Sequence, residues 1–508
     1  MQNSQKNLNA SLALLARSSF LVFITVLISK ILTYVYKVII AREYGAEAYG
    51  IFVLSLMVVG WLAIFSKMGF GEGLVRFIPI YRAKKREETG SYLLNKVVII
   101  SGGLSILAGV LLFVASNALA AQLFNNSELA VFLKIFSFAV PCMVLSSIYI
   151  SVLRAYEEIF WVSLIGNILQ SIVNVGVILL LIFFSAGTIA ISISYTLGMA
   201  AVLIASYVLV RKKVPLSFNA KAIKEKKKVF KEFKSYSTPL IFFGIVISVL
   251  HWTDSFMIGV LRSVREVGLY NAAVPIAFLI TVSIDLFRQL FLPLVTKEYS
   301  KNEFENVKQL SKQIGKWVYV VSLPLLALFF LYPAFFIQLL FGEEFIVATA
   351  SLRILAVGAL FVSLFEVSKD LLSMQGKSKL VLIDTLIAFF INVSLNLFLI
   401  PLIGITGAAI ATTISLASLG IMFAYQAYRD LKVIPLRKKM LNITGAAILA
   451  TVIVFLFGAL MPTAMPWMFA RLIIFGLSYL ALLFILKCLD KNDMAILSKI
   501  KTRIINKK

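Results

Sequence analysis

The sequence predicts an all-α integral membrane protein with about 14 transmembrane helices. Hydrophobic residues make up 60% of the 508-residue chain and charged residues 14%, whereas globular domains hold about 45–50% apolar and about 25% charged residues. Apolar stretches near the ~20 residues needed to cross a bilayer of ~30 Å recur along the whole chain. No segment alternates like a barrel strand, so helices are the remaining way to satisfy the backbone in lipid.

The apolar stretches define fourteen expected spans in order along the chain. The first is retained as a helix, because no A-x-A-like cleavage site follows it as it would in a signal peptide. The only cysteines are Cys142 and Cys488, which excludes a disulfide framework and a zinc site. The spans are expected at about 18–41, 48–68, 92–116, 130–153, 160–184, 187–210, 237–261, 268–294, 317–341, 348–371, 380–402, 405–428, 440–461 and 467–487.

The connecting segments alternate in charge, and this sets the orientation. The basic segments are 81–88, 211–234, 297–316, 428–439 and the tail from Lys487. The loops without Lys or Arg lie around 117–129, 185–187, 342–347, 402–406 and 462–466. Segments rich in Lys and Arg stay on the cytoplasmic side of a membrane. We therefore expect a multi-pass protein of the cell membrane with both termini in the cytoplasm. We therefore expect the basic residues behind the net charge of +25 to orient the helices and to contact anionic membrane lipids. A nucleic-acid partner is not expected.

The longest hydrophilic segment, 211–234, places six spans before it and eight after it. We expect a solvated amphipathic linker lying on anionic headgroups, and a specific recognition role is the alternative. The predicted domains are an N-terminal lobe at 1–210, a basic cytoplasmic linker at 211–236, a C-terminal lobe at 237–430, two extra helices at 431–487 and a basic cytoplasmic tail at 488–508.

Similar residues recur at an offset of about 220 residues, which indicates an internal repeat. The matching pairs are Tyr49 with Tyr270, Lys67 with Arg288, Asn174 with Asn396, and Gly187 with Gly407. The pairs match near both the start and the end of the repeated segment. This predicts two parallel six-helix lobes, related by a pseudo-twofold axis along the membrane normal, plus two C-terminal helices. Duplicated lobes of this kind are typical of alternating access, with the substrate held between them.

Ionisable residues within the spans are the candidate functional residues. A bare lysine at mid-span, such as Lys30, costs at least about 2.5–3.5 kcal/mol, and the offset maps it onto His251, the only histidine. We expect both to line a hydrated cleft; the alternative is a sealed bundle in which buried acids pair with them. Asp254 lies one turn from His251 and Asp285 one turn before Arg288, so both acids are candidates for charge pairing or coupling.

Three stretches carry a resemblance to a known family. The first is "REYGAEAYGIFVLSL" followed by "MGFGEGLVRFIPIYRAKKREE", the second is "DSFMIGVLRSVREVGLYNAA" and the third is "INVSLNLFLIPLIGITGAAIATTIS". These stretches resemble the polysaccharide flippases of the multidrug/oligosaccharidyl-lipid/polysaccharide exporter superfamily. The resemblance implies a flippase that moves a lipid-pyrophosphate-linked oligosaccharide from the inner to the outer leaflet for cell-surface polysaccharide biosynthesis. It also implies a cationic cavity, and the substrate-binding role is carried over to Lys30, His251, Lys67 and Arg288.

The expected partners follow from the same resemblance. They are a polyprenyl-pyrophosphate-linked oligosaccharide as substrate, membrane lipids, and a polysaccharide polymerase or glycosyltransferase as a candidate protein partner. No catalytic residue, cofactor or metal is expected.

Two other functions compete with this interpretation. A cation-coupled multidrug or small-molecule antiporter of the same superfamily would need a buried carboxylate cluster within one lobe. The N-terminal spans show none, since Glu72 and Arg76 are predicted to form an interfacial i,i+4 pair. A membrane glycosyltransferase or ligase would need paired acids or a metal-binding motif on an outer loop. Glu343 and Glu344 are its only candidates, and adjacent residues point apart on a helix, so an enzyme is not expected.

Overall fold

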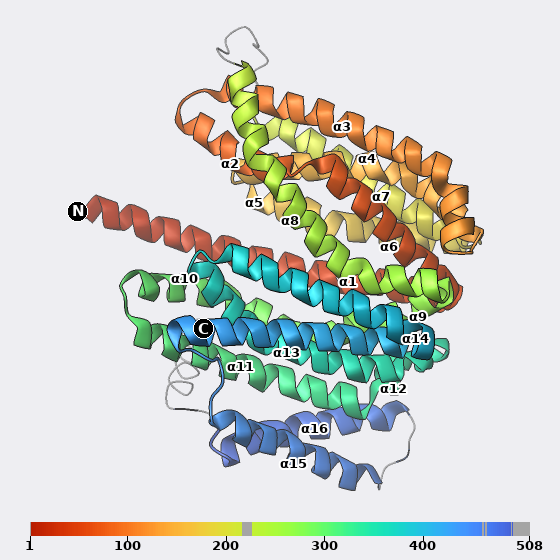
Figure 1. The fold of residues 1–508 in the computed structure, drawn as a ribbon, viewed down its shortest axis with the longest axis vertical. Coiled ribbons are helices and arrows are strands. Elements are labelled where there is room, and N and C mark those ends of the chain that lie inside the picture. The colour runs from red at the N-terminus through yellow and green to blue at the C-terminus, as the bar shows by residue number, and fades with distance from the viewer. Residues whose placement is uncertain (1, 216–225, 460–461, 463–464, 489, 491–508) are drawn as a thin grey trace. The chain divides into compact units, whose positions relative to one another are not determined.

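The computed structural model describes residues 2–215, 226–459, 462, 465–488 and 490, and every regular element among them is helical (Figure 1). The predicted all-α fold is therefore confirmed. The chain divides into two compact units, unit 1 from Met1 to Leu269 and unit 2 from Tyr270 to Lys508.

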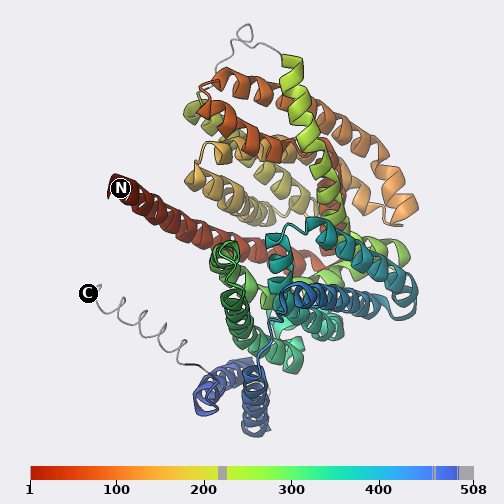
Figure 2. The same cartoon turned by 60° about the vertical axis from the view of Figure 1, so that its left-hand side comes forward.

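Unit 1 is a bundle in which α4 packs between α3 and α7, while α1 and α2 pack against α4 and also contact α8. Figure 2 shows α8 as one long helix. The interior of unit 1 is apolar, with Phe70, Leu74, Val152 and Phe233 buried in one cluster. Its helices are α1 (Gln2–Lys67), α2 (Phe70–Ala83), α3 (Glu87–Ala118), η1 (Leu119–Leu123), α4 (Glu128–Ala155), α5 (Ile159–Ser163), η2 (Leu164–Leu169), α6 (Gln170–Phe183), α7 (Ile189–Lys213) and α8 (Lys226–Leu261).

Unit 2 is built around α13, which packs along both α11 and α14. The last two helices, α15 and α16, lie side by side, and α15 packs on α11 (Figures 1 and 2). Helix α9 (Val264–Ala277) crosses the boundary between the units. It is followed by η4 (Phe278–Thr281), α10 (Val282–Ser300), α11 (Phe304–Leu331), α12 (Pro333–Leu340), η5 (Glu343–Ala348), α13 (Thr349–Met374), α14 (Ser378–Leu431), α15 (Lys439–Ala459) and α16 (Met465–Ile485).

The two longest helices are broken inside. Helix α1 has extended backbone with positive φ at Gly45 (φ 80°, ψ −177°), and α14 breaks at Ile403 and Gly404 (φ 59°, ψ −137° at the glycine). Glycine populates positive φ without a steric penalty, so it is the residue suited to such a break. A straight helix as long as α14 would extend about 80 Å, whereas a bilayer needs about 30 Å. Each break therefore separates two spans.

The described residues contain twelve stretches long and apolar enough to cross a membrane. Two of them, Leu27–Ala83 and Ser378–Leu431, have 57 and 54 residues and contain the breaks. Counting each as two spans gives fourteen, in agreement with the predicted number. Helix α8 begins at Lys226 and packs within unit 1, so the last part of the predicted 211–236 linker is helical. The pseudo-twofold axis and the lobe boundaries stay predictions.

Candidate functional site

A polar pocket of about 420 Å³ lies in unit 1 around Lys67. Helix α1 ends at Lys67 because Met68 and Gly69 both take left-handed backbone conformations (φ 49° and 66°). This turn leads directly into α2, and it places Lys67 beside polar side chains of α4 and η2. The other lining residues with polar side chains are Glu72, Ser147, Ser151, Arg154 and Asn167.

Among the described residues, only one of the two cations in this pocket has an acidic partner. Arg154 donates a hydrogen bond to the Glu72 carboxylate at 3.2 Å. The predicted pair between Glu72 and Arg76 is therefore wrong: Arg76 instead lies over the Tyr236 ring, 4.1 Å from its centroid. An exposed i,i+4 pair contributes only about 0.5 kcal/mol, so a partner on another helix can displace it. Lys67 makes no hydrogen bond or ion pair with the described residues.

Lys30 is exposed on the part of α1 that lies beside this pocket. Its neighbour Ser29 donates a hydrogen bond to the backbone carbonyl of Asn167 at 2.5 Å, and Asn167 also lines the Lys67 pocket. The structure therefore brings the two predicted lysines into the same region of unit 1.

His251 is exposed on α8 and lies within Coulombic range of Lys37 and Asp254. Lys37 follows Lys30 by seven residues, so the two lysines share one face of α1. Lys37 is not among the candidate residues predicted from the sequence. The signal that could have found it was this two-turn spacing of lysines within one span.

Arg288 lies in unit 2, where two acids of α13 neutralise it. Its Nη2 is 2.6 Å from Oδ1 of Asp370, whose side chain is 1% exposed, and its Nη1 is 3.4 Å from Oε1 of Glu366. Lys369 also contacts Glu366, at 2.5 Å. Asp285, one turn before Arg288, is exposed. Glu366 and Asp370 were missed, although two acids one turn apart within a predicted span were a visible signal.

Asn392 joins the two halves of α14 across its break, and Asn396 supports it from the same half. Asn392 donates a hydrogen bond to the Thr412 hydroxyl at 3.2 Å, and Asn396 donates to the Asn392 side-chain oxygen at 3.1 Å. Both asparagines are buried. These contacts stabilise the helical hairpin formed by the stretch that carried the family resemblance.

The family model "Polysaccharide biosynthesis protein" matches residues 15–297, more than half of the chain. The chain belongs to this family. A second family model, "MatE", matches residues 239–398.

Two relatives with assigned names extend this result. The chain is 21% identical to a "Putative O-antigen transporter" of Shigella flexneri, over 74% of this chain and 88% of the relative. It is 26% identical to the "Probable low-salt glycan biosynthesis flippase Agl15" of Haloferax volcanii, over 81% of this chain and 83% of the relative.

Solved structures show which fold the helices form. The chain is similar to "Lipid II flippase MurJ, inward closed conformation", with a TM-score of 0.72, 19% identity, and coverage of 91% of this chain and 98% of that one. It is also similar to an inward-facing "multidrug resistance MATE family transporter of the MOP superfamily", with a TM-score of 0.65, 14% identity, and coverage of 80% and 94%. The family, the names of the relatives and the membrane spans together support the predicted function, a multi-pass membrane flippase for polysaccharide biosynthesis.

Proposed function

We propose that this flippase carries a lipid-diphosphate-linked oligosaccharide from the cytoplasmic to the outer leaflet by alternating access, with both termini in the cytoplasm. The family and the named relatives support a glycan substrate. A polysaccharide polymerase or glycosyltransferase would be a suitable protein partner, because it would use the carried glycan.

The observation that carries this proposal is Lys67 in its polar pocket, where no described residue forms an ion pair with it. A diphosphate brings about two negative charges that cannot enter hydrocarbon without a cation and polar partners. The lysine ammonium supplies a point charge for phosphate, and the pocket has polar side chains from Ser147, Ser151 and Asn167 around it. The lipid tail can remain in the bilayer while only the head group enters.

The remaining predicted cations take separate roles in this proposal. Lys30 and His251, together with Lys37, would form a cationic face on unit 1 along which the diphosphate moves. Asp254 would balance the charge of that face. In unit 2, Arg288 would have two roles, to position the α13 acids and to contact the substrate, because it is already paired with Glu366 and Asp370.

A proteoliposome assay with a defined lipid-linked oligosaccharide tests the proposal. We expect wild type to flip the substrate and Lys67→Ala to flip it at least about tenfold more slowly at equal protein level, since a charge-assisted contact contributes about 1.5–3 kcal/mol. Lys96→Ala is the matched control, because Lys96 is exposed on α3 and lines none of the described pockets. Equal rates for Lys67→Ala and Lys96→Ala would refute the role of the pocket.

A cation-coupled antiporter is the second candidate function, and the Arg288 network favours it. Such a transporter needs acids in the interior of one unit. In unit 2 these are the buried Asp370 and the half-buried Glu366. The match to the MatE model includes both residues. Uptake of small organic cations by the same proteoliposomes, driven by a proton or sodium gradient and abolished in Asp370→Asn, would support this function over glycolipid flipping.

A further inference from the structure

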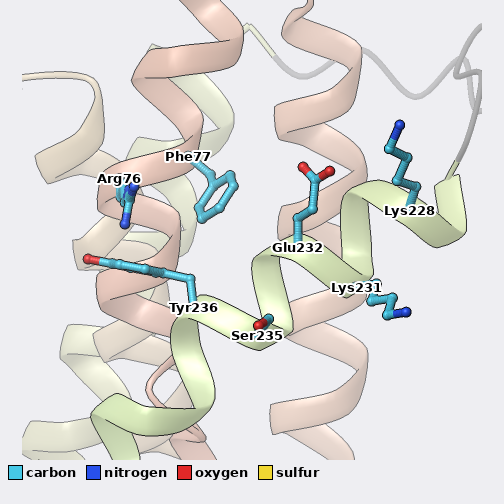
Figure 3. Close-up of a pocket in the computed structure, with 7 residues that line it drawn as sticks. All are labelled: Arg76, Phe77, Lys228, Lys231, Glu232, Ser235 and Tyr236. Atoms are coloured by element: carbon cyan, nitrogen blue, oxygen red, sulfur yellow. The ribbon is translucent and has the colours of Figure 1, made fainter.

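A second polar groove, of about 530 Å³, lies in unit 1 between α2 and the first three turns of α8. Figure 3 shows Arg76 and Phe77 of α2 beside Tyr236 of α8, with Glu232 and Lys228 one and two turns earlier on α8. This groove is distinct from the Lys67 pocket, because the two share no lining residue.

The wall of the groove is fixed by aromatic packing. The Phe77 ring contacts the rings of Tyr236 and Phe233 with centroid distances of 5.8 and 5.7 Å, and Phe233 is fully buried. The two helices pack closely, since a Cβ at Gly73 would lie 2.2 Å from the Ser237 hydroxyl and 2.8 Å from the Phe233 ring. Tyr236 is therefore held in place, and its ring supports the Arg76 guanidinium from one side at 4.1 Å.

The groove carries an excess of positive charge. Arg76, Lys228 and Lys231 line it against the single carboxylate of Glu232. Arg76 makes no ion pair with the described residues, because Glu72, the acid one turn before it, is paired with Arg154. A guanidinium that stacks on a ring keeps its edge N–H groups available for a phosphate, which they can bind in a bidentate way.

We infer that this groove binds the headgroup phosphate of an anionic phospholipid of the cytoplasmic leaflet. The leaflet follows from the orientation proposed above, since α2 leads into the basic 81–88 segment and α8 begins with three lysines. Tyrosine is enriched at membrane interfaces, and arginine and lysine attract the anionic lipids of the cytoplasmic leaflet. The phosphate would lie on Arg76 and Lys228, and the acyl chains would follow the apolar wall toward the bilayer.

Native mass spectrometry of the purified full-length protein in neutral detergent can test this site. The probe is phosphatidylglycerol, with phosphatidylcholine, inorganic phosphate and a polyprenyl diphosphate as comparisons. We expect Arg76→Gln to weaken the tightest phosphatidylglycerol association about tenfold, as loss of a charge-assisted hydrogen bond predicts. Arg86→Gln is the matched control, because it removes an exposed charge from the same basic region without lining the groove; its effect should stay below about twofold.

Each other outcome counts against the inference. Equal losses in Arg76→Gln and Arg86→Gln would mean diffuse attraction to the basic surface. Equal binding of phosphatidylcholine, or full competition by inorganic phosphate at the same concentration, would remove the anionic lipid as ligand. Preference for the polyprenyl diphosphate, lost in Arg76→Gln, would assign the groove to the transported substrate. If Arg76→Gln does not fold, Lys228→Gln replaces it with the same expected selectivity.

Discussion

Lys67 and Arg288 are a pair related by the sequence offset, but their surroundings differ. Lys67 lies in a polar pocket without a partner among the described residues, whereas Arg288 is held by Asp370 and Glu366. A positive charge in the first environment is available to an anionic ligand. In the second environment the same charge also compensates a buried acid, so its loss affects the fold.

Replacing Arg288 is therefore expected to destabilise the protein. Arg288→Ala leaves Asp370, which is almost fully buried, without its counter-charge, and such a loss costs about 2–4 kcal/mol when one partner is partly exposed. Thermal unfolding in detergent, followed by tryptophan fluorescence, measures the change. The double variant Arg288→Ala/Asp370→Asn should recover part of the stability. An unchanged melting temperature together with lost transport would instead place Arg288 in direct contact with substrate.

At the predicted cytoplasmic end of unit 2, one acid that follows α16 contacts three cations. Asp490 accepts hydrogen bonds from Lys316 at 2.9 Å, from Arg437 at 2.8 Å and from Lys439. Lys316 is fully buried. Burial alone would raise the pKa of Asp490, but hydrogen bonds and charges from Lys439 and Lys316 lower this pKa to about 2.

This pKa predicts how the contact depends on pH. A carboxyl whose pKa is lowered on folding stabilises the folded state above its ordinary value of 3.8, and this contribution is lost as the pH falls through about 2. The contact should thus be constant from pH 5 to pH 8. At pH 7, Asp490→Asn should raise the maleimide labelling rate of the buried Cys488 in a Cys142→Ser background. An unchanged rate would show that the ion pairs do not hold this segment.

At the scale of the helices, close backbone packing fixes α1 against α9 within unit 1. A Cβ at Gly50 would lie 1.9 Å from the Val264 carbonyl oxygen, and one at Gly268 would lie 1.9 Å from the Ala46 carbonyl oxygen. Small residues permit this approach in membrane helices, where dispersion and weak polar contacts drive association. The contact follows directly after the break at Gly45.

Gly50→Ala is therefore expected to separate α1 from α9 and to lower stability by about 1–3 kcal/mol, as overpacking does. Gly103→Ala is the control, because no atom lies within 4 Å of the added methyl group, and it should leave the melting temperature unchanged or slightly higher. Both variants are compared by thermal unfolding in detergent. Equal melting temperatures of the two variants would mean that α1 and α9 accommodate the added methyl group without loss of stability.

Hydropathy could predict most helices because membrane burial acts on each segment by itself. The predicted ends at 41 and 48, and at 402 and 405, bracket the breaks that the structure shows at Gly45 and Gly404. Partners on other helices could not be predicted in the same way. Glu72 pairs with Arg154 of α4 and not with Arg76 of its own helix. The spacing of residues along the sequence does not show that α4 lies beside α2.

At the scale of the whole molecule, transport requires a water-filled route through apolar helices. The positive-inside pattern predicts that the basic segments and both termini face the cytoplasm. A reporter fused to the C-terminus should therefore be active only as a cytoplasmic reporter. Activity only outside the cytoplasm would contradict the predicted even number of spans.

The wet route itself can be tested at Lys30. This residue is exposed on α1, while its neighbour Ser29 contacts Asn167 at the Lys67 pocket. In a background without Cys142 and Cys488, Lys30→Cys should react with a membrane-impermeant maleimide, because thiolates form readily only in water.

Ile106→Cys is the matched control for this labelling. Ile106 is 57% exposed on α3 and is expected to face lipid, so a cysteine there should react at least about tenfold more slowly, since the charged thiolate is disfavoured in hydrocarbon. Addition of the lipid-linked oligosaccharide should slow labelling at Lys30→Cys and leave Ile106→Cys unchanged. If both positions react equally slowly from either side of the membrane, Lys30 faces a dry environment and acts as a structural charge, and the cationic route along α1 would have to be abandoned.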